Sequence, residues 1–160
     1  MIGLTVLTVG KLKESWMREG CGEYLKRLRL WSHPQVVEVE EYRLPENPAP
    51  AQIAACLERE GERLLERVPK GAVIAALCIE GRQMSSEQLS QWIERSASTG
   101  RGEFCFVIGG SYGLSETVKR AADLRLSMSP MTFPHQLARV MVLEQLYRAL
   151  SISAHAKYHK

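Results

Sequence analysis

The last five residues, AKYHK, carry side chains that could bind an aromatic, phosphate-bearing partner. Lys157 and Lys160 flank Tyr158 and His159. The lysines supply charge for phosphate, the phenol ring can stack on a base, and the imidazole titrates near neutral pH. An inert, frayed terminus is the alternative interpretation of the same residues.

A second group of candidate residues lies upstream of this tail. Residues 134–152 are expected to form a helix, in which Glu144 and Arg148 lie one turn apart in the order that favours an ion pair. His135 and Arg139 have the same spacing at the start of that helix. Either couple could be structural or could belong to a site.

The junction before this helix, SMSPMTFPHQL (127–137), begins with seven uncharged residues, contains two methionines and is expected to be buried. Its hydroxyls come from Ser127, Ser129 and Thr132, and its apolar surface from Met128, Met131 and Phe133. This mixture suits a neutral heteroaromatic ring that is held by main-chain groups. The alternative is a packed loop in which Thr132 caps the helix and Pro134 occupies its first turn.

Three segments are candidates for the ligand-binding edge of an α/β sheet, which lies outside the carboxyl ends of its strands. They are LCIEG (77–81), IGGSYG (108–113) and MSPMTF (128–133). Gly109 and Gly110 allow the backbone to approach a ligand closely. Their GGxxG spacing matches neither the dinucleotide fingerprint GxGxxG nor the phosphate-binding P-loop. A tight turn between a strand and a helix explains these glycines equally well.

Apolar runs and helical patterns alternate along the chain, which predicts an α/β fold with a mostly parallel sheet flanked by helices. Strands are expected over 2–10, 36–42, 72–79, 103–109 and 124–128. Helices are expected over 15–31, 51–67, 86–97, from about Ser115, and over 134–152. The three prolines of the segment 44–50 mark a loop.

Length and composition are typical of one globular domain, expected over residues 1–160. Hydrophobic residues make up 45% and charged residues 24% of the 160. No uncharged apolar window is long enough to span a membrane, and the first apolar run precedes its lysines, unlike a signal peptide. We therefore expect a cytoplasmic protein. The net charge of +3 is too small to define a partner, although Lys26, Arg27 and Arg29 form a local basic cluster.

The cysteines do not indicate a metal or disulfide site. Four of them, Cys21, Cys56, Cys78 and Cys105, lie far apart without a CxxC pair, so buried, reduced thiols are expected and no bound metal. No GxSxG motif supports a hydrolase.

The expected last helix is apolar around most of its circumference, which requires cover on every side. Its apolar residues are Leu137, Val140, Met141, Val142, Leu143, Leu146 and Leu150. Because a sheet covers only one side of a helix, we infer that a second copy of the chain covers the other and that the protein is a homodimer.

Three stretches together resemble a known family. FVIGGSYGLSE, LSMSPMTFPHQLARVMVLEQLYRA and the terminal YHK are similar to the bacterial ribosomal RNA large-subunit methyltransferase H family. These small SPOUT-class enzymes methylate N3 of a pseudouridine. The resemblance is dense from about Leu77 to Lys160 and looser before, where VGKLKE also matches.

The resemblance implies a SPOUT fold whose C-terminal part forms a trefoil knot, a homodimer, and S-adenosylmethionine as methyl donor. Donor contacts carried over from the family fall on Leu77, Gly109 and the segment 128–133. That segment consists of Met128, Ser129, Pro130, Met131, Thr132 and Phe133. The uncharged junction would then be the knotted loop around the donor.

The implied reaction needs a group that accepts the N3 proton. His159 and His135 have a suitable pKa, Tyr158 could orient or stack the base, and Arg148 could stabilise charge on the uracil carbonyls. With no appended RNA-binding domain, the dimer itself would recognise ribosomal RNA or the ribosome. The alternative is a non-catalytic, nucleotide-binding α/β dimer.

Overall fold

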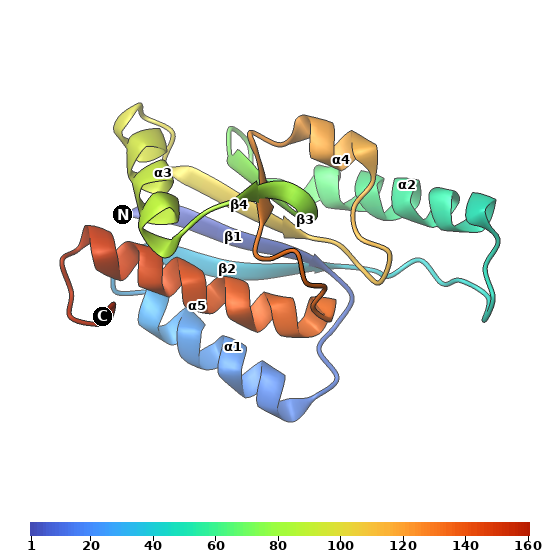
Figure 1. Ribbon diagram of the computed structural model, residues 1–160, viewed down its shortest axis with the longest axis horizontal. Helices are drawn as coiled ribbons and strands as arrows, with labels where there is room; N and C mark the ends of the chain where they lie inside the picture. Colours follow the sequence, from blue (N-terminus) through green and yellow to red (C-terminus); the bar gives the residue numbers. More distant parts are fainter.

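The computed structural model describes residues 1–160 and contains one five-stranded sheet in which all neighbouring strands are parallel (Figure 1). The strand order is β2-β1-β4-β3-β5. The strands are β1 (Ile2–Val9), β2 (Ser32–Val39), β3 (Val73–Gln83), β4 (Glu103–Ile108) and β5 (Leu124–Ser127). This confirms the expected α/β class and parallel sheet.

Helices cover both faces of the sheet. One face carries α1 (Ser15–Leu28), α3 (Ser86–Ser98) and α5 (His135–Ser153), and the other carries α2 (Pro50–Arg67) and α4 (Glu116–Ala121). Alternate strand residues point to opposite faces, so Val6 and Phe106 pack under α1, α3 and α5, whereas Leu7 and Val107 pack under α2 and α4. Every expected element is present in the expected order.

The second strand is displaced from its expected position. The alternation of residues 36–42 predicted its start four residues too late, because β2 begins at Ser32. The Ser32 hydroxyl donates to the carbonyl of Leu28 at 2.8 Å, which ties the start of the strand to the end of α1. Pro34 is tolerated inside β2 because this strand lies at the edge of the sheet, where one side needs no partner.

Strand β3 is longer than expected and irregular. Its pairing with β5 shifts register between Leu77 and Arg82, so the residues between them leave the ladder. A Cβ on Gly81 would lie 2.8 Å from the carbonyl carbon and oxygen of Arg125. Only glycine permits this approach of two backbones. We call residues 78–81 the β3 bulge.

Helix α5 is covered mainly by its own chain. Leu143 and Leu146 are 0% exposed within the single chain, and α1 and α3 flank the helix on the sheet face (Figure 1). The expectation that these two leucines lie in an interface between copies is therefore wrong. Leu137, Val140 and Met141 of the same helix stay half-buried in the single chain, and the homodimer stays a prediction.

All four cysteines are free, and Cys21, Cys56 and Cys105 are buried as expected, whereas Cys78 is half-buried. Burial raises the pKa of Cys105 to about 12. No helix has both the length and the apolar character needed to cross a membrane.

Candidate functional site

A pocket of about 700 Å³, here called the strand-end pocket, opens beside the carboxyl ends of β3, β4 and β5. It contains seven of the eight residues that were expected to contact the methyl donor: Leu77, Gly109, Met128, Ser129, Met131, Thr132 and Phe133. Pro130 is exposed and does not line it. Three segments that are distant in sequence thus meet at the edge where α/β sheets bind ligands.

The glycine turn after β4 forms one wall of this pocket. A Cβ on Gly109 would lie 2.2 Å from the carbonyl oxygen of Gly113, and Gly113 itself has a φ of +85°. A bridge between Gly110 and Gly113 closes the turn. A side chain at position 109 would therefore clash with the backbone of the turn itself, whether or not a ligand is bound. The spacing of the glycines in the sequence did not reveal this reason.

The segment 128–133 forms the opposite wall. The hydroxyl of Ser129 accepts the backbone N–H of Met131 at 3.0 Å, and the hydroxyl of Ser127 donates to the carbonyl of Ser129 at 3.1 Å. The expected burial of this junction is wrong for its middle residues, since Met131 is 72% exposed. The packed-loop alternative is also wrong, because Thr132 does not cap α5, which begins after Pro134 without a side-chain cap.

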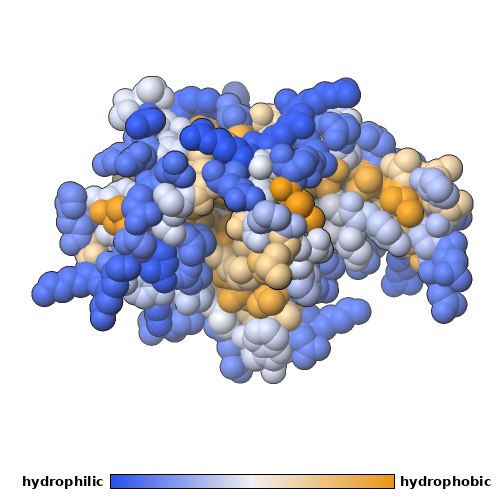
Figure 2. Space-filling model, in the orientation of Figure 1, coloured by the Kyte–Doolittle hydropathy of each residue, from blue (hydrophilic) through white to orange (hydrophobic).

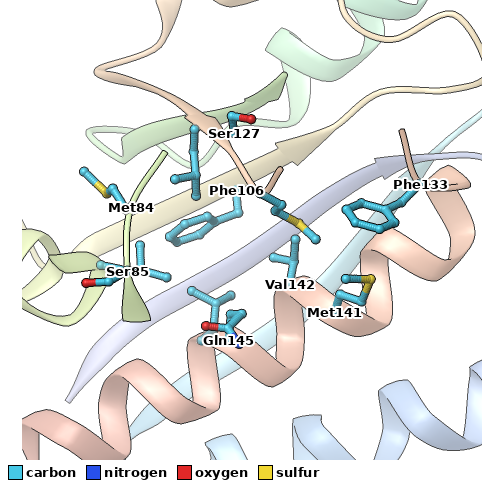
Figure 3. Close-up of a pocket in the computed structure, with 12 residues that line it drawn as sticks. Met84, Ser85, Phe106, Ser127, Phe133, Met141, Val142 and Gln145 are labelled. Atoms are coloured by element: carbon cyan, nitrogen blue, oxygen red, sulfur yellow. The ribbon is translucent and has the colours of Figure 1, made fainter. Parts of the chain in front are cut away.

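A smaller, mostly apolar pocket of about 180 Å³ is lined by residues of α3, β4, β5 and α5 and by Phe133 (Figure 3). Met84 from the end of β3 and Val142 from α5 line it around Phe106. Met128 and Phe133 line both pockets. The two pockets are therefore neighbours with a shared wall.

Charged groups that sequence analysis missed lie in the strand-end pocket. Lys119 of α4 forms an ion pair with Glu80 of the β3 bulge, and a longer one, at 3.8 Å, with Glu116. The hydrogen bond from Lys119 is the main cause that lowers the pKa of Glu80. Sequence analysis placed the segment LCIEG (77–81), which contains Glu80, at the ligand-binding edge. It did not predict that Lys119 pairs with Glu80.

His135 lines the strand-end pocket at the first residue of α5. Burial lowers its pKa, and the charge of Arg139 acts in the same direction, while Glu41 opposes them. The imidazole is therefore neutral at neutral pH and can accept a proton.

The expected couple of His135 with Arg139 is wrong. Arg139 is 3% exposed and donates to Glu38 at 2.7 Å and to the carbonyl oxygen of Gly10 at 3.0 Å. These bonds tie the first turns of α5 to the ends of β1 and β2. Arg139 thereby fixes the helix that carries His135 into the pocket wall.

The other three catalytic candidates form a cluster at the far end of α5, here called the tail cluster. Arg148 donates to Glu144 at 2.6 Å, which confirms the expected ion pair. The Tyr158 hydroxyl donates to Glu144 at 3.2 Å, and His159 lies 3.3 Å from Arg148 and 2.6 Å from Glu87. The structure thus brings Arg148, Tyr158 and His159 together and leaves His135 apart.

Tyr158 is packed and is not a frayed end. Its ring lies 4.6 Å from that of Tyr147 and 4.8 Å from the guanidinium carbon of Arg148. Burial, followed by the hydrogen bond with Tyr24 and the charge of Glu144, raises the pKa of Tyr158 to about 12. The phenol therefore stays protonated at neutral pH and can donate a hydrogen bond, but it cannot act as a base.

No group of three or more His, Cys, Asp or Glu side chains is arranged to hold a metal ion. The site is therefore an uncharged glycine turn, a partly apolar pocket and an imidazole at a helix start. Such a set of groups suits the binding of an organic cofactor.

Comparison with known proteins identifies the class. A family model described as "Predicted SPOUT methyltransferase" matches residues 2–159. Two solved structures share the fold at low identity. One is a probable methyltransferase from Bordetella pertussis, with a TM-score of 0.52 and 15% identity, and the match covers 92% of this chain and 95% of that one. The other is a probable methylase family protein from Haemophilus influenzae, with a TM-score of 0.51 and 12% identity, and the match covers 98% of this chain and 70% of that one.

Curated relatives narrow the class to one family. Ribosomal RNA large subunit methyltransferase H of Pelotomaculum thermopropionicum is 50% identical over 99% of both chains. The proteins of the same name from Bacillus pumilus and Carboxydothermus hydrogenoformans are each 41% identical over 98% or more of both chains. The chain belongs to the ribosomal RNA large subunit methyltransferase H family of SPOUT methyltransferases. The resemblance seen in the sequence is thereby confirmed.

Proposed function

We propose that the protein transfers a methyl group from S-adenosylmethionine to N3 of a pseudouridine in large-subunit ribosomal RNA. Family membership supports the reaction class and the donor. The observation that carries the proposal is the strand-end pocket, which gathers seven of the eight donor contacts expected from the family onto one cavity. We take residues 1–160 as one functional domain that acts in the cytoplasm, where ribosomes lie.

The residues of the pocket fit the donor. Its volume of about 700 Å³ lies within the range of cofactor sites. Gly109 and the segment 128–133 offer backbone and soft apolar walls to the adenine. The donor supplies an electrophilic sulfonium methyl group, and the chain must hold the acceptor nitrogen in line with it.

The acceptor N3–H must lose its proton to become nucleophilic. His135, neutral and on the pocket wall, and His159, in the tail cluster, are the two candidate bases. Tyr158 is protonated and would donate a hydrogen bond to the base or stack on it. Arg148 contacts the ring of Tyr158 and the imidazole of His159. Its guanidinium would stabilise negative charge on the uracil carbonyls.

The proposed site needs two copies of the chain. Arg148 follows His135 by nearly four turns of α5, a rise of about 20 Å, so a tail cannot reach the pocket of its own chain while it stays on α5. In a symmetric dimer with antiparallel α5 helices, the end of one helix meets the start of the other. Each tail would then complete the partner's pocket.

We also propose that the C-terminal part is a trefoil knot. Two features support it. Strand β5 pairs with β3 on both sides of the β3 bulge. Within the bulge, the backbone of Gly81 lies close to the backbone of Arg125 in β5. A threaded chain would hold the segment 128–133 rigidly against the donor.

Transfer of a labelled methyl group tests the proposed function. Ribosomes and free large subunits from cells that lack this protein would be incubated with labelled S-adenosylmethionine and the enzyme, and the RNA mapped by mass. We expect one methylated pseudouridine. Binding of the donor without transfer to any ribosomal RNA would instead support the non-catalytic nucleotide-binding dimer.

A further inference from the structure

Three exposed apolar side chains surround the mouth of the strand-end pocket. Of the six large apolar side chains that are most exposed on the chain, Ile79, Tyr112 and Met131 all line this one cavity. Their exposed fractions are 49%, 49% and 72%. We call these three residues the apolar rim. Apolar groups gathered at one opening, rather than scattered singly, mark a binding surface.

Figure 2 shows that apolar side chains on this face gather near the middle and again toward the right end, among predominantly hydrophilic side chains. The rim residues offer flat and polarisable groups at the pocket entrance.

Each rim residue stands on a backbone that the fold holds in place. Ile79 belongs to the β3 bulge, which is pinned where the chain resumes its pairing with β5. Tyr112 lies in the turn closed by Gly110 and Gly113. Met131 donates its backbone N–H to the hydroxyl of Ser129. Side chains presented on fixed backbone lose little entropy on binding, so the rim is preorganised.

The occupant of the rim follows from the reaction, so this step rests on the proposed function. With the donor inside the pocket, the acceptor must approach through the mouth. A base becomes accessible only after it leaves its stack, and RNA-binding proteins receive such bases on aromatic and apolar side chains. We propose that the apolar rim receives the unstacked acceptor nucleobase and that Tyr112 is its stacking platform.

A cation for the adjacent phosphate lies beside the rim. Arg125 is exposed on β5, the outer edge strand. Its backbone lies against Gly81 of the β3 bulge, and its positive charge partly opposes the burial that raises the pKa of the Cys78 thiol. A nucleotide with its base on Tyr112 would have its phosphate attracted towards this side of the pocket.

Kinetics of ring-removing and ring-keeping variants test the proposal. Methyl transfer to ribosomes would be measured for the wild type, Tyr112→Ala and Tyr112→Phe. We expect Tyr112→Ala to raise KM for ribosomes roughly tenfold, the effect of losing one base–aromatic stack, and Tyr112→Phe to resemble the wild type. Leu30→Ser, at an exposed apolar site (69%) outside the pocket, should leave KM unchanged.

Two further measurements exclude other occupants of the rim. Calorimetry with S-adenosylmethionine should give the wild-type Kd for Tyr112→Ala, and sedimentation should give the wild-type mass. A weakened Kd would place Tyr112 in the donor site, and a changed mass would make the rim an interface between copies; either result overturns the proposal.

Failure of the rim proposal is distinguishable from failure of the proposed function. An active wild type with an unchanged KM in Tyr112→Ala would refute the rim alone. A wild type that methylates no ribosomal RNA would refute the proposed function, and the rim proposal with it.

Discussion

His135 lines the strand-end pocket at the start of α5, whereas His159 contacts Arg148 near the other end of the same helix. The rise of the helix between residues 135 and 148 is about 20 Å. The two imidazoles that could accept the N3 proton are therefore separated within one chain. Only an arrangement with a second copy could bring both to one acceptor base.

Mixed dimers should reveal whether the tail acts on the partner's pocket. A chain that lacks residues 158–160 keeps an intact pocket, and a Gly109→Ala chain keeps an intact tail. When assayed at limiting S-adenosylmethionine, the truncated chain should be inactive and Gly109→Ala strongly impaired, and unfolding and refolding them together should restore methyl transfer, because one heterodimer site combines both intact parts. Activity that stays absent after sedimentation confirms mixed dimers would contradict a tail that works across the interface.

Gly109→Ala should weaken donor binding. Its Cβ would lie 2.2 Å from the carbonyl oxygen of Gly113, so the turn must open, with an expected loss of affinity of roughly tenfold or more. Gly102→Ala is the matched control, since a Cβ there meets nothing within 4 Å. Calorimetry with S-adenosylmethionine checks both, and equal affinities would show that the turn does not shape the donor site.

Leu146→Ala should destabilise the fold of each chain. Leu146 is 0% exposed in the single chain, and truncating such a leucine typically costs about 2–5 kcal/mol. Leu30→Ala, at a residue that is 69% exposed, should change the free energy of unfolding by less than about 0.5 kcal/mol. Denaturant titration at several protein concentrations separates this effect from dimer dissociation, which alone would depend on concentration.

The pKa of His135 should make stability fall in mild acid. Burial holds the folded-state pKa below 6.5, so the unfolded chain binds a proton first as the pH drops. The contribution of His135 is fully present above pH 6.5 and is lost as the pH falls below it. His135→Gln should flatten this part of the curve of unfolding free energy against pH, and NMR titration of the imidazole should give a pKa below 6.5.

The raised pKa of Tyr158 should make the fold less stable at high pH. Its pKa is raised from 10.0 to about 12, so the unfolded chain releases the phenolic proton first. The stabilisation is present below pH 10 and is lost as the pH rises from 10 towards about 12. Tyr158→Phe should lack this loss, which denaturant titrations across that range would show. Equal pH dependence in both proteins would mean that the tail does not pack on α5.

The alternation of apolar runs and helical patterns was enough to predict the α/β class, the order of the elements and the edge that bears the pocket. The start of β2 was misplaced because Ser32 is held by a hydrogen bond to Leu28, which no strand periodicity contains. The prediction that Leu143 and Leu146 of α5 lie in an interface between copies was wrong for another reason. The apolar circumference of the helix is real, but α1 and α3 cover part of what a sheet alone could not, including Leu143 and Leu146.

Side-chain partners were harder to predict than the pocket. The spacing of Glu144 and Arg148 identified a true pair, whereas the same spacing failed for His135, because Arg139 bonds to Glu38 across the sheet edge. Residues more than a hundred positions apart leave no local pattern. Lys119 was missed although its partner Glu80 is only 39 positions away, because Glu80 lies on a bulge that only the pairing of β3 with β5 creates.

The interior position of β1 in the sheet has a consequence for biosynthesis. This strand is made before the others, yet it lies between β2 and β4, and Gly3 pairs with Glu103. Until β4 leaves the ribosome, one edge of β1 keeps unpaired backbone groups, which can join other chains. Contacts so distant in sequence also slow folding. Nascent or prematurely terminated chains that end before residue 103 should therefore aggregate and depend on chaperones.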